Sequence, residues 1–255
     1  MHKPEIIEAM IEISQMRDFD ESWELLKRGA KLLEFRVPYY VSAYINDPTS
    51  SFEDIEAGNH VVYKDEYPDV FNDFYNEGQY VNHDPAMAWV KNKNDCATFK
   101  EIFQPVIKGE LGGKTAELCH AFLDMNSKTG AIISFENKSN FALSAMTVLT
   151  DSDLTEEQGD SILAENLQTM RVMANIFHNS RTLFTQAQKY FNLTSQELEI
   201  LQGICLGQRA KQIAHSQNKF VGVVEKQIAN IKRKLVVNTV PQAVAKALHF
   251  DLIDF

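Results

Sequence analysis

The chain has little that could cross-link it or hold it in a membrane. Its 255 residues include only three cysteines, Cys96, Cys119 and Cys205, which are far apart and form no CxxC pair. This spacing argues against a disulfide framework and a zinc site, and it favours a reducing cytoplasm. No apolar run approaches the roughly 18 residues that a membrane helix needs. The first residues mix carboxylates with apolar side chains, which is not the pattern of a signal peptide.

The sequence also lacks the residue patterns of catalytic and metal sites. The seven histidines show no HExxH or HxH spacing, and no GxSxG nucleophile motif occurs. Residues 109–115 read GELGGKT, which is one residue short of the phosphate-binding loop GxxxxGK[ST]. A flexible loop is the better interpretation of that segment. We therefore predict no enzyme activity, no metal and no cofactor.

Charge divides the chain into two unequal parts. The whole sequence has a net charge of −10, from 25 Lys and Arg against 35 Asp and Glu. Residues 186–255 contain nine of the bases and five of the acids, a net charge of +4, which leaves −14 on residues 1–185. A change of this kind marks a domain boundary, and the basic part is the candidate for binding nucleic acid. A chance excess of bases in a short segment is the alternative.

The acidic part alternates between helical and strand patterns. Apolar residues fall at helical spacing at 10–13 and 23–33, and strands are expected at 39–44, 130–135 and 141–147. Thr155 opens a long helix that continues to residue 178. We expect an α/β sensor domain, an α-β-α sandwich, over residues 1–178, and a linker over residues 179–192.

The basic part reads as four short helices. Thr194 and Glu197 form a capping box, and Pro241 opens the last helix. In the third helix an apolar stripe of Val224, Ile228 and Ile231 lies opposite a basic and polar face. We expect an all-α helix-turn-helix domain over residues 193–255. Periodicity alone also fits any small helical domain with a solvated charged face.

The residues of this segment resemble the LuxR-type helix-turn-helix without a gap. The matching positions are Leu193, Thr194, Glu197, Glu199, Leu201, Gly207, Lys211, Ile213, Ala214, Val224, Ile228, Lys234, Leu235, Val237, Ala243 and Val244. A match of this length is far more specific than a short motif. The resemblance implies a double-stranded DNA operator as partner, with contacts from Lys211, Glu225, Lys226, Ala229, Asn230, Arg233 and Lys234.

The DNA-reading helix departs from the family pattern. Where the family has Ile-Ser before this helix, the chain has Lys219-Phe220, and it therefore loses a serine cap that is typically worth ~1 kcal/mol. By resemblance Glu225 and Lys226 face the groove. Glu225 would repel phosphate, although it could accept a hydrogen bond from a cytosine amine.

A second resemblance covers the acidic part. Tyr67, Phe71, Tyr75, Tyr80, Asp84 and Pro85, with Phe99 fifteen residues after Asp84, keep the spacing of the autoinducer-binding domain of quorum-sensing LuxR-type regulators. That family binds an acyl chain joined by an amide to a lactone ring. By resemblance the ligand-binding residues are Tyr67, Phe71, Tyr75, Asp84, Trp89, Phe99 and Ser144. Asp84 would accept the amide N–H, and Tyr67 and Ser144 would donate to the acyl carbonyls. Core aromatics and a helix-capping aspartate are the structural alternative.

One substitution bears directly on the ligand. The family has a tryptophan at position 71 that donates its indole N–H to the lactone carbonyl, whereas Phe71 has no donor. An unpaired carbonyl costs about 1–3 kcal/mol, or roughly ten- to a hundredfold in affinity. We therefore expect either an acyl-homoserine lactone or a different amphipathic small molecule.

Together these patterns predict a cytoplasmic, homodimeric transcription regulator that senses a small molecule. The dimer follows from the resemblance and from the many apolar residues of the helix at 155–178. The alternative is a regulator that needs no ligand or no longer reads DNA and blocks a related transcription factor by forming a heterodimer with it. Phe220, Val223 and Glu225 motivate that alternative.

Overall fold

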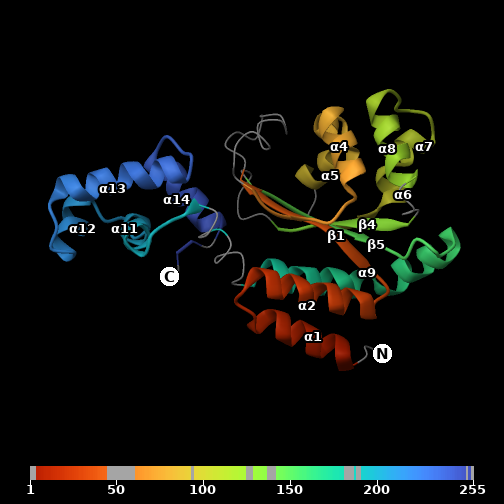
Figure 1. Cartoon of the computed structure of the whole chain (residues 1–255), viewed down its shortest axis with the longest axis horizontal. Coiled ribbons are helices and arrows are strands. Elements are labelled where there is room, and N and C mark those ends of the chain that lie inside the picture. The colour runs from red at the N-terminus through yellow and green to blue at the C-terminus, as the bar shows by residue number, and fades with distance from the viewer. Residues whose placement is uncertain are drawn as a thin grey trace.

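A computed structural model describes residues 4–44, 61–92, 95–124, 129–136, 142–180, 187, 191–250 and 252–253. Most of the expected linker lies outside this part. The N-terminal part is a five-stranded antiparallel sheet with helices on both faces (Figure 1). The strands, in the order β2-β1-β5-β4-β3, are β1 (Arg36–Tyr44), β2 (Val61–Asp65), β3 (Cys96–Thr98), β4 (Gly130–Ser134) and β5 (Ala142–Leu149).

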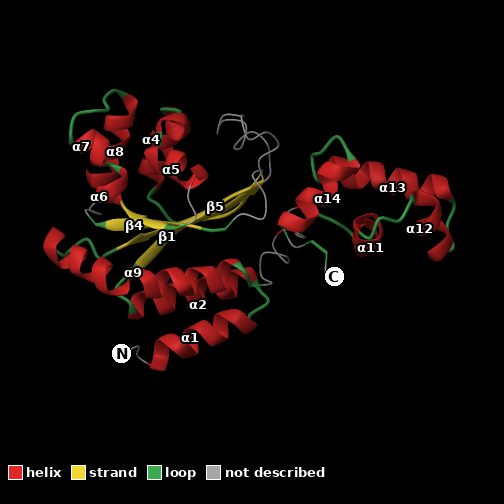
Figure 2. Ribbon diagram, turned by 180° about the vertical axis from the view of Figure 1, so that it is seen from behind, coloured by secondary structure: helices red, strands yellow, loops and turns green. Residues whose placement is uncertain are grey.

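One face of the sheet carries the main core. Helices α1 (Pro4–Gln15), α2 (Phe19–Leu32) and α9 (Glu156–His178) cover it (Figures 1 and 2). Trp23, Tyr40 and Phe177 meet there, all at most 1% exposed. Burial of large aromatic rings of this kind contributes much of the hydrophobic stabilisation of a core. The predicted helices at the N-terminus and at 155–178 are confirmed, and Thr155 caps α9 in a capping box with Gln158.

Short helices cover the opposite face. They are α4 (Asp69–Glu77), the 3-10 helix η1 (Tyr80–His83), α5 (Pro85–Asn92), α6 (Phe99–Ile102), α7 (Gln104–Ile107) and α8 (Lys114–Asp124). A second apolar cluster fills the space between these helices and the sheet. The segment that resembles a phosphate loop joins α7 to α8, and Lys114 donates to the carbonyl of Gly78 at 2.8 Å.

The C-terminal part is entirely helical over its described residues. It comprises α11 (Ser195–Cys205), α12 (Ala210–Ser216), α13 (Val221–Lys234) and α14 (Val240–His249), which lie beside the end of the sheet (Figure 1). Val224 and Ile231 of α13 are at most 1% exposed and pack into their shared core. None of the helices in the described ranges is both long enough and apolar enough to cross a bilayer. The expected fold class, an α/β domain followed by helices, is confirmed.

Candidate functional site: an apolar cavity with a buried carboxylate

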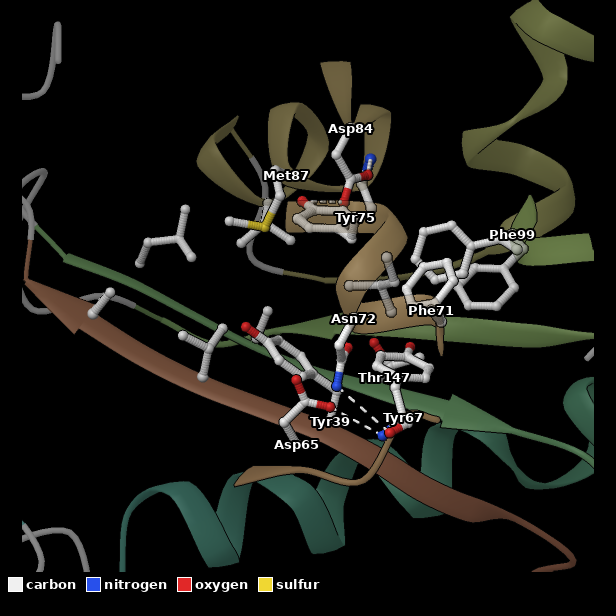
Figure 3. Close-up of a pocket in the computed structure, with 18 of the residues that line it drawn as sticks. Tyr39, Asp65, Tyr67, Phe71, Asn72, Tyr75, Asp84, Met87, Phe99 and Thr147 are labelled. Atoms are coloured by element: carbon white, nitrogen blue, oxygen red, sulfur yellow. Dashed lines mark hydrogen bonds between the residues drawn. The ribbon is translucent and has the colours of Figure 1, made fainter. Parts of the chain in front are cut away.

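A cavity of about 180 Å³ lies between the sheet and helices α4 to α8 (Figure 3). Most of its wall is apolar. Strands β1 and β5 provide its floor through Val41, Ala43, Leu143 and Ala145. Alternate residues of a strand point to opposite faces, so every second residue of these strands reaches the cavity. The aromatic wall consists of Tyr39, Tyr67, Phe71, Tyr75, Phe99, Phe103 and Phe122.

Asp84 places a carboxylate in this apolar wall, and it is only 8% exposed. Its Oδ1 accepts from the backbone N–H of Ala86 at 2.8 Å, which caps the start of α5. Its Oδ2 accepts from the hydroxyl of Tyr75 at 3.2 Å (Figure 3). Asp84 therefore caps α5 with one carboxylate oxygen and bonds a cavity residue, Tyr75, with the other.

Burial is the largest influence on the pKa of Asp84. It raises the pKa of this carboxyl from 3.8 to about 6, although hydrogen bonds from Ala86, Tyr75 and Met87 act in the opposite direction. A carboxylate has about four acceptor positions, so these three donors leave room for one more. A ligand that donates a hydrogen bond here would favour the ionised form.

A second polar group lies at the other end of the cavity. Tyr67 stacks on Tyr39 with ring centroids 6.0 Å apart and makes a side-chain hydrogen bond with Thr147. Burial raises the pKa of Tyr67 well above its usual range, so the phenol keeps its proton. Asn72 lies beside them and donates to the Tyr67 carbonyl at 3.5 Å (Figure 3). Tyr67 and Thr147 therefore place hydroxyl groups at this end of the cavity.

Phe71 sits between the two polar ends without a polar atom of its own. It is 7% exposed, and its ring centroid lies 4.7 Å from that of Phe122. Phe99 stacks on Phe103 at 5.3 Å on the same side. Phe71 and Phe99 thus form a purely apolar part of the wall.

Two residues expected in the cavity are not part of its lining. Ser144 points to the opposite face of the sheet, because the cavity takes Leu143, Ala145 and Thr147 from β5 and strand alternation sends Ser144 the other way. Trp89 packs beside the apolar cluster, but α5 lines the cavity with its neighbouring face of Ala86, Met87 and Val90. The cavity is lined by the other five expected residues, Tyr67, Phe71, Tyr75, Asp84 and Phe99.

Ser144 instead belongs to a contact between the sheet and the C-terminal helices. Its Oγ lies 3.0 Å from Oγ of Ser42 on β1, and both side chains are buried. Nε2 of His249, at the end of α14, lies 3.4 Å from Oγ of Ser42. The same two strands thus face the cavity on one side and the last helix on the other.

The expected DNA contacts lie mostly on the solvent side of α13. Lys226, Ala229 and Arg233 are exposed on the side away from Val224 and Ile231, Glu225 is exposed next to them, and Asn230 is half-buried. Lys211 is exposed on α12.

Lys234 is the exception among these residues. Its Nζ lies 2.7 Å from Oε2 of Glu197 and donates to the carbonyl of Asn192 at 2.6 Å. Burial alone would raise the pKa of Glu197, but hydrogen bonds from Lys234 and Thr194 outweigh it and lower that pKa. Lys234 therefore neutralises a buried carboxylate inside the domain, and its place among the DNA contacts stays a prediction.

We predict that Lys234→Met destabilises the C-terminal helices. It leaves the Glu197 carboxylate, 4% exposed, without its cation, a loss worth about 3 kcal/mol or more for a buried pair. Urea unfolding followed by circular dichroism measures the change. The control is Arg233→Met, on the exposed neighbour, which should shift the transition by under about 0.5 kcal/mol. Equal effects of the two variants would contradict this role.

We predict that Asp84→Asn removes a pH dependence from the stability of the ligand-free protein. A raised folded pKa contributes stability that is full below the unfolded value of 3.8 and is lost as the pH rises through about 6. The loss is roughly 3 kcal/mol for a shift of this size. Urea unfolding between pH 4 and pH 8, compared with the exposed control Asp73→Asn, measures it. The Asp84→Asn curve should diverge from wild type toward high pH, and parallel curves would refute the prediction.

Comparisons with known proteins agree with this geometry. The family model of the autoinducer binding domain matches residues 18–180 of the sequence. No curated relative matches the sequence. The structure of Escherichia coli SdiA is similar, with a TM-score of 0.53, 15% identity and 98% of each chain covered. SdiA in complex with octanoyl-rac-glycerol gives a TM-score of 0.53 at 14% identity, covering 98% of this chain and 97% of that one.

A third similar structure is the N-acylhomoserine lactone dependent LuxR family transcription factor CepR2 from Burkholderia cenocepacia. It has a TM-score of 0.47 and 12% identity, and the match covers 68% of this chain and 92% of that chain. The family model covers well over half of the chain and includes every residue that lines the cavity. The chain therefore belongs to the family of the autoinducer binding domain.

Proposed function

We propose that the protein regulates transcription in response to an acyl-chain signal whose polar head donates a hydrogen bond to Asp84. The observation that carries this proposal is the 8% exposed carboxylate in the wall of an apolar cavity. A buried ionised carboxylate is costly unless donors surround it. A ligand that supplies a further donor would reduce this cost, so its binding would be coupled to the charge state of Asp84.

The head group need not be a lactone. Phe71 offers no donor to a lactone carbonyl, and the aromatic wall around it is apolar. An acylglycerol, the ligand in the SdiA complex, combines an acyl chain with hydroxyl groups that can donate to a carboxylate. The same combination suits this cavity, in which Val41, Leu143 and Phe122 would contact the chain. We therefore propose that the ligand is an acyl compound whose head group carries an N–H or O–H donor. A lactone ring is not required.

The test compares octanoyl-homoserine lactone with octanoylglycerol by calorimetry on wild type and Phe71→Trp. The variant regains an indole N–H, so its affinity for the lactone should rise about ten- to a hundredfold while its affinity for the glycerol ester changes little. Phe74→Trp on the same helix is the control, because Phe74 does not line the cavity. Tighter lactone binding by wild type than by Phe71→Trp would contradict the ligand assignment.

DNA binding and dimerisation complete the proposal. Lys226, Ala229 and Arg233 form an exposed face on α13, as a helix that enters the major groove requires. Three apolar side chains of the sensor part, Ile7, Ile11 and Val172, are each more than half exposed on the adjacent helices α1 and α9. This exposed apolar face supports a homodimer. We place the protein in the cytoplasm, where its operator would be accessible.

The contact of His249 with the sheet supports a route from ligand to DNA. Ser42 lies between the cavity residues Val41 and Ala43, and Ser144 lies between Leu143 and Ala145. A ligand that displaces the floor of the cavity would therefore move both serines, and with them the contact to His249 on α14. We propose that this contact couples ligand occupancy to the position of the C-terminal helices.

His249→Ala should uncouple the two binding events. Ligand changes operator affinity in wild type by a factor in the usual range of about 5 to 150, and the variant should lose most of this change. Fluorescence anisotropy with and without ligand measures it, and the intrinsic affinity for ligand should stay the same. The control is His120→Ala, an exposed histidine on α8. Full coupling in His249→Ala would rule out this route.

A further inference from the structure

The N-terminus of α13 presents apolar side chains to solvent, which is unusual for a helix expected to bind a polyanion. Phe220, the residue before the helix, is 86% exposed, and Val223, three residues later, is 45% exposed. Both lie outside the buried stripe of Val224 and Ile231, so neither is needed for the core. Phe220 also makes no side-chain hydrogen bond that caps the helix. Phe220 therefore lies almost wholly in solvent, and nearly half of the Val223 surface is exposed beside it.

The basic side chains around them favour DNA as the partner. Lys211 and Lys226 are exposed on the two helices that form the helix-turn-helix, Glu225 is an exposed acid beside Lys226, and Gly222 has no atom within 4 Å of where a Cβ would stand. A cationic border with open space at the helix start fits the phosphate backbone and the groove between its strands. In this motif the N-terminal residues of the second helix contact the base edges.

The C5-methyl of thymine is the apolar group that the bases offer in the major groove. We infer that Phe220 and Val223 contact thymine methyl groups and so set the base preference of the operator at one or two positions. This inference rests on the proposed DNA binding and adds its specificity. Phe220 replaces a capping serine at this position, so the chain gives up cap stability for an apolar contact surface.

Deoxyuridine, which differs from thymidine only in lacking this methyl group, provides the test. Double-stranded DNA sites are first selected from a random pool with the full chain, at one fixed salt concentration. Each thymine of the selected site is then replaced singly by deoxyuridine. Loss of one buried methyl group should weaken wild-type binding about fourfold at one or two positions.

Phe220→Ser should abolish this penalty at a contacted position. A serine restores a preferred N-cap, so the variant is expected to fold at least as well as wild type. Leu206→Ser, which removes another exposed apolar side chain (61%) from outside α13, is the control and should keep the penalty. A penalty that persists in Phe220→Ser, or that is absent from wild type while salt-dependent DNA binding remains, overturns the inference and leaves the proposed function standing.

Failure of the proposed function has a different signature. Weak binding that does not depend on salt or sequence would mean that the chain does not read DNA, and it would overturn the inference as well. Phe220 and Val223 would then be free to contact a related regulator in a heterodimer. A fourfold loss in wild type that disappears in Phe220→Ser supports thymine reading.

Discussion

The alternation of side chains along β5 and along β1 from Tyr39 onward, past an irregularity between Arg36 and Tyr39, is the constraint on which the rest of the structure depends. Leu143, Ala145 and Thr147 face the cavity, and Ser144 and Met146 face the opposite side of the sheet. A shift of one residue in either strand would exchange the two sets and bury the serines in the ligand site. One pair of strands therefore fixes both the floor of the cavity and the surface that the C-terminal helices contact.

Asp84 shows how the site combines stability with function. A carboxylate in an apolar wall destabilises the folded protein near neutral pH, as the raised pKa indicates. Capping of α5 through Ala86 recovers part of that cost and also fixes the direction of the side chain. The group is therefore held in place before any ligand arrives, so little side-chain ordering is left to oppose binding.

Much of the architecture could be predicted because the signals are local. The capping boxes at Thr155 and Thr194 and the apolar stripe of α13 depend only on neighbours within a few residues, and each is present in the structure. Strands β2 and β3 were missed, since β3 has three residues and β2 depends on pairing with β1. A short strand takes its stability from a partner distant in sequence.

The candidate site was only partly predictable for the same reason. Spacing placed Tyr67, Tyr75 and Asp84 in one site, but spacing does not say which face of β5 is turned toward the cavity. Ser144 was therefore assigned to the wrong side, and Tyr39 and Thr147 were not found. In the C-terminal part, composition could not separate a lysine that binds DNA from one that neutralises a buried acid, as Lys234 does.

The same limit applies to the charge of the C-terminal part. Lys246 is fully buried and donates to the carbonyl of Leu235 at 2.7 Å, and burial lowers its pKa to about 6. It is therefore withdrawn from the surface, so it cannot neutralise a phosphate although it counts toward the net charge of +4 on residues 186–255. Because non-specific affinity for DNA grows with the number of phosphates that are neutralised, one domain with so few free cations would hold DNA weakly under the proposed function. Discrimination would then come from contacts to bases and from two domains acting together in the proposed dimer. An exposed phenylalanine at the start of the reading helix is consistent with that requirement, since an apolar base contact does not weaken as salt rises.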